Sequence, residues 1–107
     1  MSEYVDYLTD AFEAFGPVQV RKMFGGYGIF HEGLMIGIVA DDMLYLKVDD
    51  QSIEAFKERG LSQFEYKKGA KTVGMSYYMA PEDALEDPTE LEHWASMASE
   101  AARRSKK

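Results

Sequence analysis

The sequence contains no cysteine at all. This absence excludes disulfide bonds, thiolate metal sites and cysteine nucleophiles, and it suits a reducing compartment. The sequence also has no apolar run long enough to cross a bilayer, and its first six residues lack the basic start and apolar centre of a secretory signal. We therefore expect a cytoplasmic protein without a membrane span.

Basic charge is scarce and is unevenly distributed. The 12 lysines and arginines oppose 19 acidic residues, which gives a formal net charge of −7. Residues 1–50 hold 3 basic and 9 acidic groups, residues 51–80 hold 5 and 3, and residues 81–107 hold 4 and 7. A domain with this balance repels nucleic-acid phosphates at long range. We therefore do not expect direct nucleic-acid binding.

Apolar side chains are plentiful. Hydrophobic residues make up 46% of the chain and aromatic residues 13%, a composition far from that of disordered proteins. A chain of 107 residues is long enough for one compact domain and short for two. The sequence shows no internal repeat and no low-complexity linker. We expect a single domain that spans residues 1–107.

Helical spacing of apolar residues marks three segments of the chain. Gly16-Pro17 stops the first helix, because a left-handed cap is followed there by a residue that cannot continue it. Residues 87–90 combine a cap, a proline at the first helical position and a capping-box glutamate. We expect helices from Tyr4 to Phe15, from an Asp49 or Asp50 cap to Gly60, and from Pro88 into the tail, with a brief helical turn starting at 80–83.

Strand-like alternation marks six further segments, at residues 18–24, 27–31, 34–40, 43–48, 64–67 and 72–79. Tight turns at Gly25-Gly26, Glu32-Gly33, Asp41-Asp42 and 68–71 join neighbouring strands, which must then be antiparallel. The expected order is helix, four strands, helix, two strands, helix. We predict an α+β fold, a two-layer sandwich of a mainly antiparallel sheet with helices on one face.

The third expected strand, residues 34–40, is apolar at every position. A strand with one wet face alternates apolar and polar residues, so this unbroken run indicates that both faces are covered. One layer of helices covers only one face, and a large bare apolar patch is unusual on a soluble monomer. We therefore expect a homodimer in which the sheet face opposite the helices is buried against another subunit.

Three glycines interrupt the aromatic stretch from Arg21 to Phe30, whose sequence is RKMFGGYGIF. Glycine adopts positive φ without steric cost and lets another backbone approach closely, so the stretch reads as a tight reversal between strands. It contains no nucleophile with a base and no phosphate loop leading into a helix. The candidate contact residues in this stretch are Arg21, Lys22, Phe24, Gly25, Gly26, Tyr27 and Gly28.

The second expected hairpin lies in residues 51–80, the only one of the three sections in which basic groups outnumber acidic ones. Lys67, Lys68 and Lys71 cluster there, and Tyr77 lies on the following strand. Cations interleaved with aromatic rings are typical of surfaces that bind acidic partners or a nucleic-acid backbone. Lysines also keep exposed sheet edges soluble, which is the competing interpretation.

No set of residues has the spacing of a catalytic or metal site. Neither His31 nor His93 has a second histidine or a carboxylate pattern at ligand spacing, and Ser76 has no identifiable base. We expect a non-enzymatic protein without a catalytic residue, metal or cofactor.

Three runs carry a resemblance to a known family: Arg21 to Phe30, residues 44–49 (LYLKVD), and residues 75–78 (MSYY) before Pro81. In order and spacing they resemble the N-terminal domain of the TfoX/Sxy family, over nearly the whole chain. The resemblance implies a small α+β domain with a two-layer, secretion-chaperone-like arrangement and no enzymatic activity. Members are regulators of competence genes that act with a cyclic-AMP-responsive transcription factor. Full-length members carry a further C-terminal domain, and we expect this chain to be a stand-alone N-terminal domain.

These observations favour a regulatory or protein-interaction module, homodimeric and in contact with a transcription factor or another protein. Two alternatives remain open. A nucleic-acid-associated module would use Arg21, Lys22 and the basic hairpin, and its binding would weaken steeply with salt. A small-ligand domain would need an apolar cavity between sheet and helices with a few converging polar groups.

Overall fold

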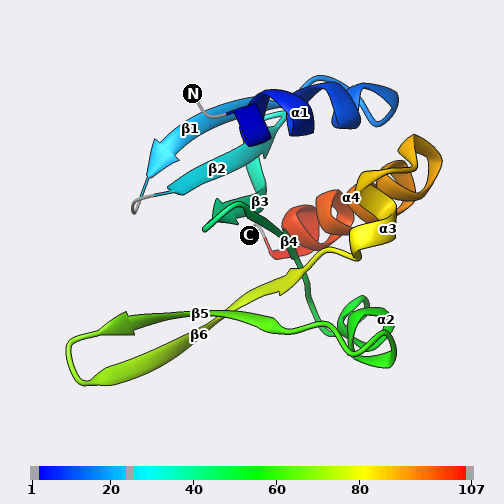
Figure 1. Cartoon of the computed structure of the whole chain (residues 1–107). Coiled ribbons are helices and arrows are strands. Elements are labelled where there is room, and N and C mark those ends of the chain that lie inside the picture. Colours follow the sequence, from blue (N-terminus) through cyan, green and yellow to red (C-terminus); the bar gives the residue numbers. More distant parts are fainter. Residues whose placement is uncertain (1–2, 24–25, 106–107) are drawn as a thin grey trace.

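The structure is a computed structural model that describes residues 3–23 and 26–105 (Figure 1). Its helices and strands follow the expected order, with a short 3-10 helix added, and the expected brief helical turn is the short helix α3 (Glu82–Leu85). They are α1 (Glu3–Ala11), η1 (Phe12–Ala14), β1 (Gln19–Met23), β2 (Gly26–His31), β3 (Leu34–Ala40), β4 (Met43–Lys47), α2 (Ile53–Glu58), β5 (Gln63–Lys68), β6 (Lys71–Met79), α3 (Glu82–Leu85) and α4 (Pro88–Ser105).

The six strands form one sheet in the order β1-β2-β3-β4-β6-β5, and every neighbouring pair is antiparallel. β6 returns to pair with β4, which leaves β5 at the sheet edge. β5 and β6 extend away from the helices as a long hairpin (Figure 1). The expected α+β class with an antiparallel sheet is therefore confirmed.

Local sequence signals explain most element ends. Gly16 has φ of 143° just after η1, as the expected helix stop requires. The β2–β3 and β3–β4 turns have positive φ at both residues of Glu32-Gly33 and Asp41-Asp42, the conformation that two-residue hairpins favour. The Asp87 carboxylate accepts the Thr89 N–H at 3.0 Å and so caps α4. The expected Ser2 cap lies outside the described residues.

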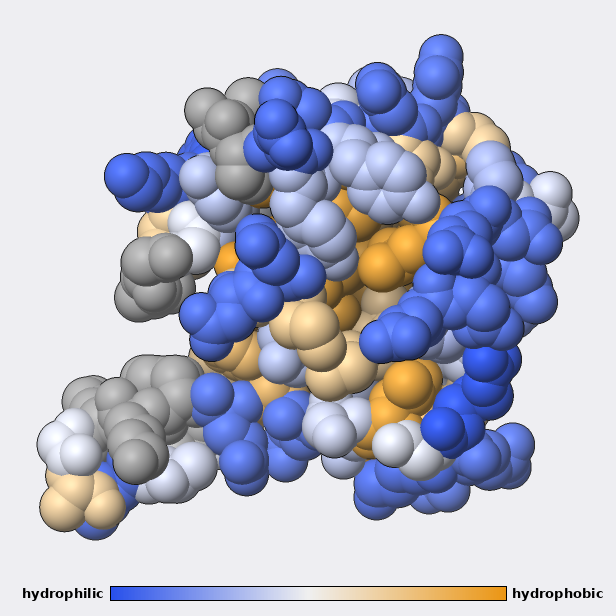
Figure 2. Space-filling model, in the orientation of Figure 1, coloured by the Kyte–Doolittle hydropathy of each residue, from blue (hydrophilic) through white to orange (hydrophobic). Residues whose placement is uncertain are grey.

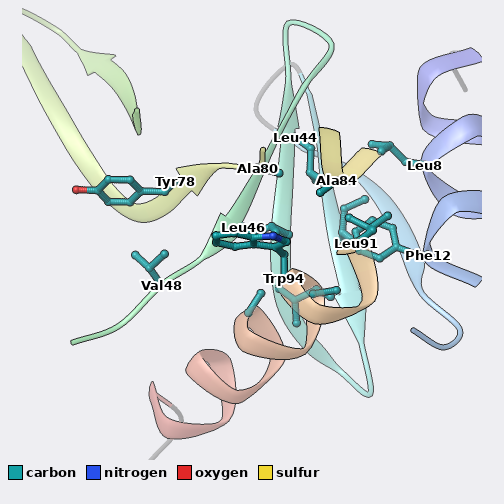
Figure 3. Close-up of a cluster of buried hydrophobic side chains, with 14 of the residues drawn as sticks. Leu8, Phe12, Leu44, Leu46, Val48, Tyr78, Ala80, Ala84, Leu91 and Trp94 are labelled. Carbon is teal, nitrogen blue, oxygen red and sulfur yellow. The ribbon is translucent and has the colours of Figure 1, made fainter. Parts of the chain in front are cut away.

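The hydrophobic core lies on one face of the sheet, which we call the inner face. Ile29, Val39, Leu44, Leu46 and Tyr78 point to it from β2, β3, β4 and β6, and cross-strand register places them side by side. Every helix contributes to the same cluster. Figure 3 shows members from α1, η1, α3 and α4 beside Leu44 and Leu46 of β4. The helical members are Leu8, Phe12, Phe56, Ala84, Leu91, Trp94, Ala95, Ala98 and Ala102.

Trp94 of α4 is the largest of these side chains and is only 6% exposed. Its ring meets that of Phe56 edge to face, with 4.8 Å between the ring centroids. The alanines that follow along the stripe of α4 are small, so the helix backbone approaches the sheet closely. This packing joins the C-terminal helix to β3 and β4, which lie much earlier in the chain.

Arg104 ties the end of α4 to the loop before α2. Its guanidinium donates to both carboxylate oxygens of Asp49, at 2.5 and 3.0 Å. The same carboxylate accepts the backbone N–H groups of Gln51 and Ser52, each at 3.1 Å. These bonds, that of Arg104 foremost, lower the pKa of Asp49 to about 2. The Asp49 carboxylate therefore stabilises the loop before α2 and also binds this loop to the end of α4.

Asp49→Asn should lower the melting temperature by a few degrees at pH 7, because the paired carboxylate is lost. A depressed pKa stabilises the fold above the ordinary carboxylate pKa of about 4, and this stabilisation disappears as the pH falls through about 2. The difference between variant and wild type should therefore shrink between pH 4 and pH 2 in thermal melts followed by circular dichroism.

Arg104→Gln should also lower the melting temperature, because it removes the other half of the same contact, and Arg103→Gln is its matched control. Arg103 is an exposed neighbour of Arg104 and forms no ion pair with another described residue. A loss as large as that of Arg104→Gln would assign the effect to overall charge rather than to the contact with Asp49.

Candidate interaction surfaces

The glycine stretch forms the β1–β2 hairpin. Met23 pairs with Gly26 across the strands, and the two residues between them, Phe24 and Gly25, lie outside the described part of the chain. Neither Gly26 nor Gly28 has positive φ, so the freedom of glycine to adopt left-handed angles is not used at these two positions. Both are instead extended strand residues, so the atoms packed around them must explain why glycine is needed there.

Close packing explains both glycines. A Cβ at Gly26 would lie 2.1 Å from the Val39 carbonyl oxygen of β3, a backbone atom. A Cβ at Gly28 would lie 2.6 Å from the Met23 sulfur and 3.1 Å from the Met35 sulfur. The expected close approach of another backbone is therefore confirmed at Gly26, whereas Gly28 makes room for side chains.

The other candidates of this stretch lie on different sides of the sheet. Tyr27 packs against the inner-face core, and Lys22 is the exposed residue paired with it. Arg21 points to the other side, where its guanidinium carbon lies 5.0 Å from the Phe30 ring centroid. The hairpin thus brings Arg21 to an aromatic ring but does not gather its candidates into one patch.

The basic hairpin lies at the far edge of the sheet from this stretch. Lys67 pairs with Thr72 and Lys68 with Lys71 near the β5–β6 turn, and the Lys71 side chain is exposed. β1 and β5 are the first and last strands of six, so about 24 Å of sheet separates them at roughly 4.8 Å a strand. Arg21 and Lys22 therefore do not form one basic surface with these lysines.

The outer face of the sheet, opposite the core, carries large side chains that the sequence alone did not single out as a group. We define it by Met23, Phe30, Met35, Ile38, Tyr45, Phe64 and Tyr77. Tyr45 and Phe64 stack with 4.8 Å between their ring centroids. Strand alternation was the signal that could have found this group, because it places every second residue of a strand on the same face. The strand order is also needed to show which of these residues are neighbours.

Tyr77 lies across the middle of the outer face and is 6% exposed. Its hydroxyl donates to the Met35 carbonyl at 3.3 Å, and the Lys47 ammonium lies 5.3 Å from its ring centroid. Burial raises the pKa of Tyr77 to about 12. Tyr77 therefore contacts Lys47, a residue with which the sequence did not group it.

β3 is covered on both faces, as its unbroken apolar run predicts. Residues 36–39 are all buried within this single chain. Ile36 and Val39 belong to the inner core, whereas Ile38, at 7% exposure, lies on the outer face beneath its neighbours. Phe30 and Tyr45 remain only half buried there. The chain's own side chains thus supply part of the cover that was expected from a second subunit.

A groove opens where α1 and α3 meet the ends of β4 and β6. Its volume is about 400 Å³, and Figure 2 shows apolar side chains at its floor with hydrophilic ones around it. The lining residues are Tyr4, Tyr7, Asp42, Met43, Leu44, Met79, Ala80, Glu82, Leu85 and Glu86. Sequence reasoning missed this groove, because it treated Tyr4 as core and Asp42 as a turn residue.

His31 is held by contacts with the segment that precedes β1. His31 Nδ1 donates to the Pro17 carbonyl at 2.8 Å, and its ring packs on Phe15 with 4.5 Å between centroids. Within residues 3–23 and 26–105, no three His, Asp or Glu side chains gather as a metal site would require. None of the described helices is long and apolar enough to cross a membrane.

Gly26→Ala should reduce the free energy of unfolding by about 3 kcal/mol or more, because the new methyl group meets a backbone carbonyl held in the β2–β3 ladder. Gly28→Ala should cost about 1 kcal/mol, since flexible methionine ends can move aside. Urea denaturation of both variants checks the ranking. Equal losses would contradict the assignment of Gly26 to backbone packing.

Comparison with known proteins supports the resemblance seen in the sequence. The chain is 27% identical over 106 residues to the DNA transformation protein TfoX1 of Aliivibrio fischeri (strain ATCC 700601 / ES114), an alignment that covers 99% of this chain and 49% of that protein. It is 25% identical over 91 residues to Protein Sxy of Escherichia coli (strain K12), covering 85% of this chain and 44% of that protein. The chain therefore spans about half the length of these curated relatives.

The family model described as the TfoX N-terminal domain matches residues 10–102, which include nearly every element of the sheet and core. The match and the two relatives agree with one another, and they confirm the family that the sequence motifs indicated. The chain belongs to the family of TfoX N-terminal domains.

Proposed function

We propose that this domain is a non-enzymatic regulatory module that acts through protein contacts, in the control of genes for DNA uptake. Family membership supports the regulatory role, and the name of the relative TfoX1, a DNA transformation protein, supports the process. The partner in this proposal is a transcription factor or another cytoplasmic protein. The net charge of −7 favours a protein partner over direct contact with nucleic acid.

The outer face is the observation that carries this proposal. We infer a two-layer, secretion-chaperone-like arrangement in which the helices cover the inner face and leave the outer face to a second copy of the chain. Phe30 and Met35 pair across β2 and β3, Tyr45 pairs with Ile38 across β3 and β4, and Phe30, Met35 and Tyr45 are large and only half buried. An apolar sheet face of this kind gains from burial at a homodimer interface.

Sedimentation or light scattering at micromolar concentration tests the homodimer. We expect a mass of two chains for the wild type and of one chain for Met35→Glu, because a carboxylate in the interface would be buried without a partner. Met97→Glu is the matched control, since Met97 is also half buried but lies on α4. A wild type that stays monomeric throughout this range would overturn the proposed dimer.

A genetic experiment tests the regulatory role in the cell that encodes the protein. Deletion of the gene should lower the transcripts of DNA-uptake genes, and the wild-type chain and Met97→Glu should restore them. Met35→Glu should fail to restore them although the protein is folded and present. Unchanged transcripts after deletion would contradict the regulatory role itself.

A further inference from the structure

The groove between α1, α3 and the sheet has the composition of a docking site. Leu44, Ala80 and Leu85 contribute apolar surface, and Met43 and Met79 add flexible thioether side chains. Methionine adapts to varied apolar partners and is common where proteins bind helices. A volume of about 400 Å³ lies at the small end of ligand pockets, which suits one or two large side chains rather than a whole cofactor.

Two tyrosines of α1 shape one wall of this groove. Tyr7 is 45% exposed and is the only exposed large hydrophobic residue in the described part of the chain. Its hydroxyl donates to the Leu85 carbonyl, which joins α1 to α3 across the groove. Burial, and after it the charge of Asp42, raises the pKa of Tyr4, so this hydroxyl stays neutral beside the carboxylate. The hydrogen bond from Tyr7 to Leu85 therefore fixes this wall of the groove in the free protein.

The rim of the groove carries negative charge from two directions. Asp42 lies on the β3–β4 turn, and Glu82 and Glu86 lie on and just after α3, whereas no lysine or arginine of the described residues lines the groove. None of these three carboxylates forms an ion pair within residues 3–23 and 26–105. The nearby Asp83 does have a partner, Arg59, with 3.0 Å between its carboxylate and the guanidinium.

We propose that this groove binds a basic amphipathic segment of a partner protein. One or two large apolar side chains of the segment enter between Tyr7 and Met79, and its lysines or arginines meet Asp42, Glu82 and Glu86. Charge complementarity selects this occupant, because an acidic rim disfavours acidic or neutral segments with the same apolar anchors. The inference rests on the proposed function, since it names the chemistry of the protein contacts through which the module acts.

A titration of the isotopically labelled full chain tests this site by nuclear magnetic resonance. The probe is a synthetic 14-residue peptide with leucine and lysine at helical spacing, used at low salt. We expect chemical-shift changes at Tyr4, Tyr7, Leu85 and the β3–β4 turn. A peptide with glutamate in place of each lysine, and one with serine in place of each leucine, should both bind at least tenfold more weakly.

Matched variants separate the groove from the general acidity of the chain. Asp42→Asn, Glu82→Gln and Glu86→Gln together should weaken binding about tenfold, as three exposed ion pairs imply. Glu54→Gln, Glu58→Gln and Glu65→Gln remove the same charge at exposed sites outside the groove and should have little effect. Equal weakening by both sets, or equal binding of the leucine-free peptide, would overturn the proposal.

The same samples distinguish this inference from the proposed dimer. Tyr7→Ala should weaken peptide binding several-fold, while sedimentation of the variant still shows two chains, because Tyr7 lies on α1 rather than on the outer face. Spermine supplies positive charge without an apolar anchor, and binding of spermine to the groove as tightly as the peptide would identify a small cation as the occupant. A monomeric wild type that binds the peptide would overturn the dimer alone.

Discussion

The packing of the C-terminal helix against the inner face of the sheet is the contact on which the rest of the structure depends. Trp94 and Leu91 of α4 lie among side chains of β3 and β4, and Phe56 packs on the indole ring from α2. Burial of such large apolar surfaces provides most of the free energy of folding. This contact buries one side of α4 and the inner face of the sheet. The outer face of the sheet and the groove beside α3 remain accessible to partners.

These two remaining surfaces differ in chemistry. The outer face is apolar and aromatic, and the cations that border it, Arg21 and Lys47, lie over the rings of Phe30 and Tyr77. The groove is apolar at its floor and negative at its rim. A surface of the first kind suits a second copy of the chain, whereas one of the second kind suits a partner of opposite charge.

The sequence was sufficient for the parts of the fold that depend on neighbouring residues. Alternation located the strands, and glycine, aspartate and proline located turns and caps such as Asp41-Asp42 and Asp87. The pairing of β4 with β6, the position of Tyr77 over β3 and the groove arise from contacts between residues far apart in the chain. No local pattern encodes those contacts. Gly26 is an example, because this position requires glycine only through the nearby Val39 carbonyl of another strand.

Trp94 is the only tryptophan of the chain, so its fluorescence reports directly on whether one chain completes its core without a second copy. The measurement is the emission maximum on dilution through the micromolar range and below. The account predicts an emission maximum typical of a buried indole at every concentration, because the cover of Trp94 comes from α2 and the inner face of the same chain. A shift to the emission of a water-exposed indole on dilution would contradict it.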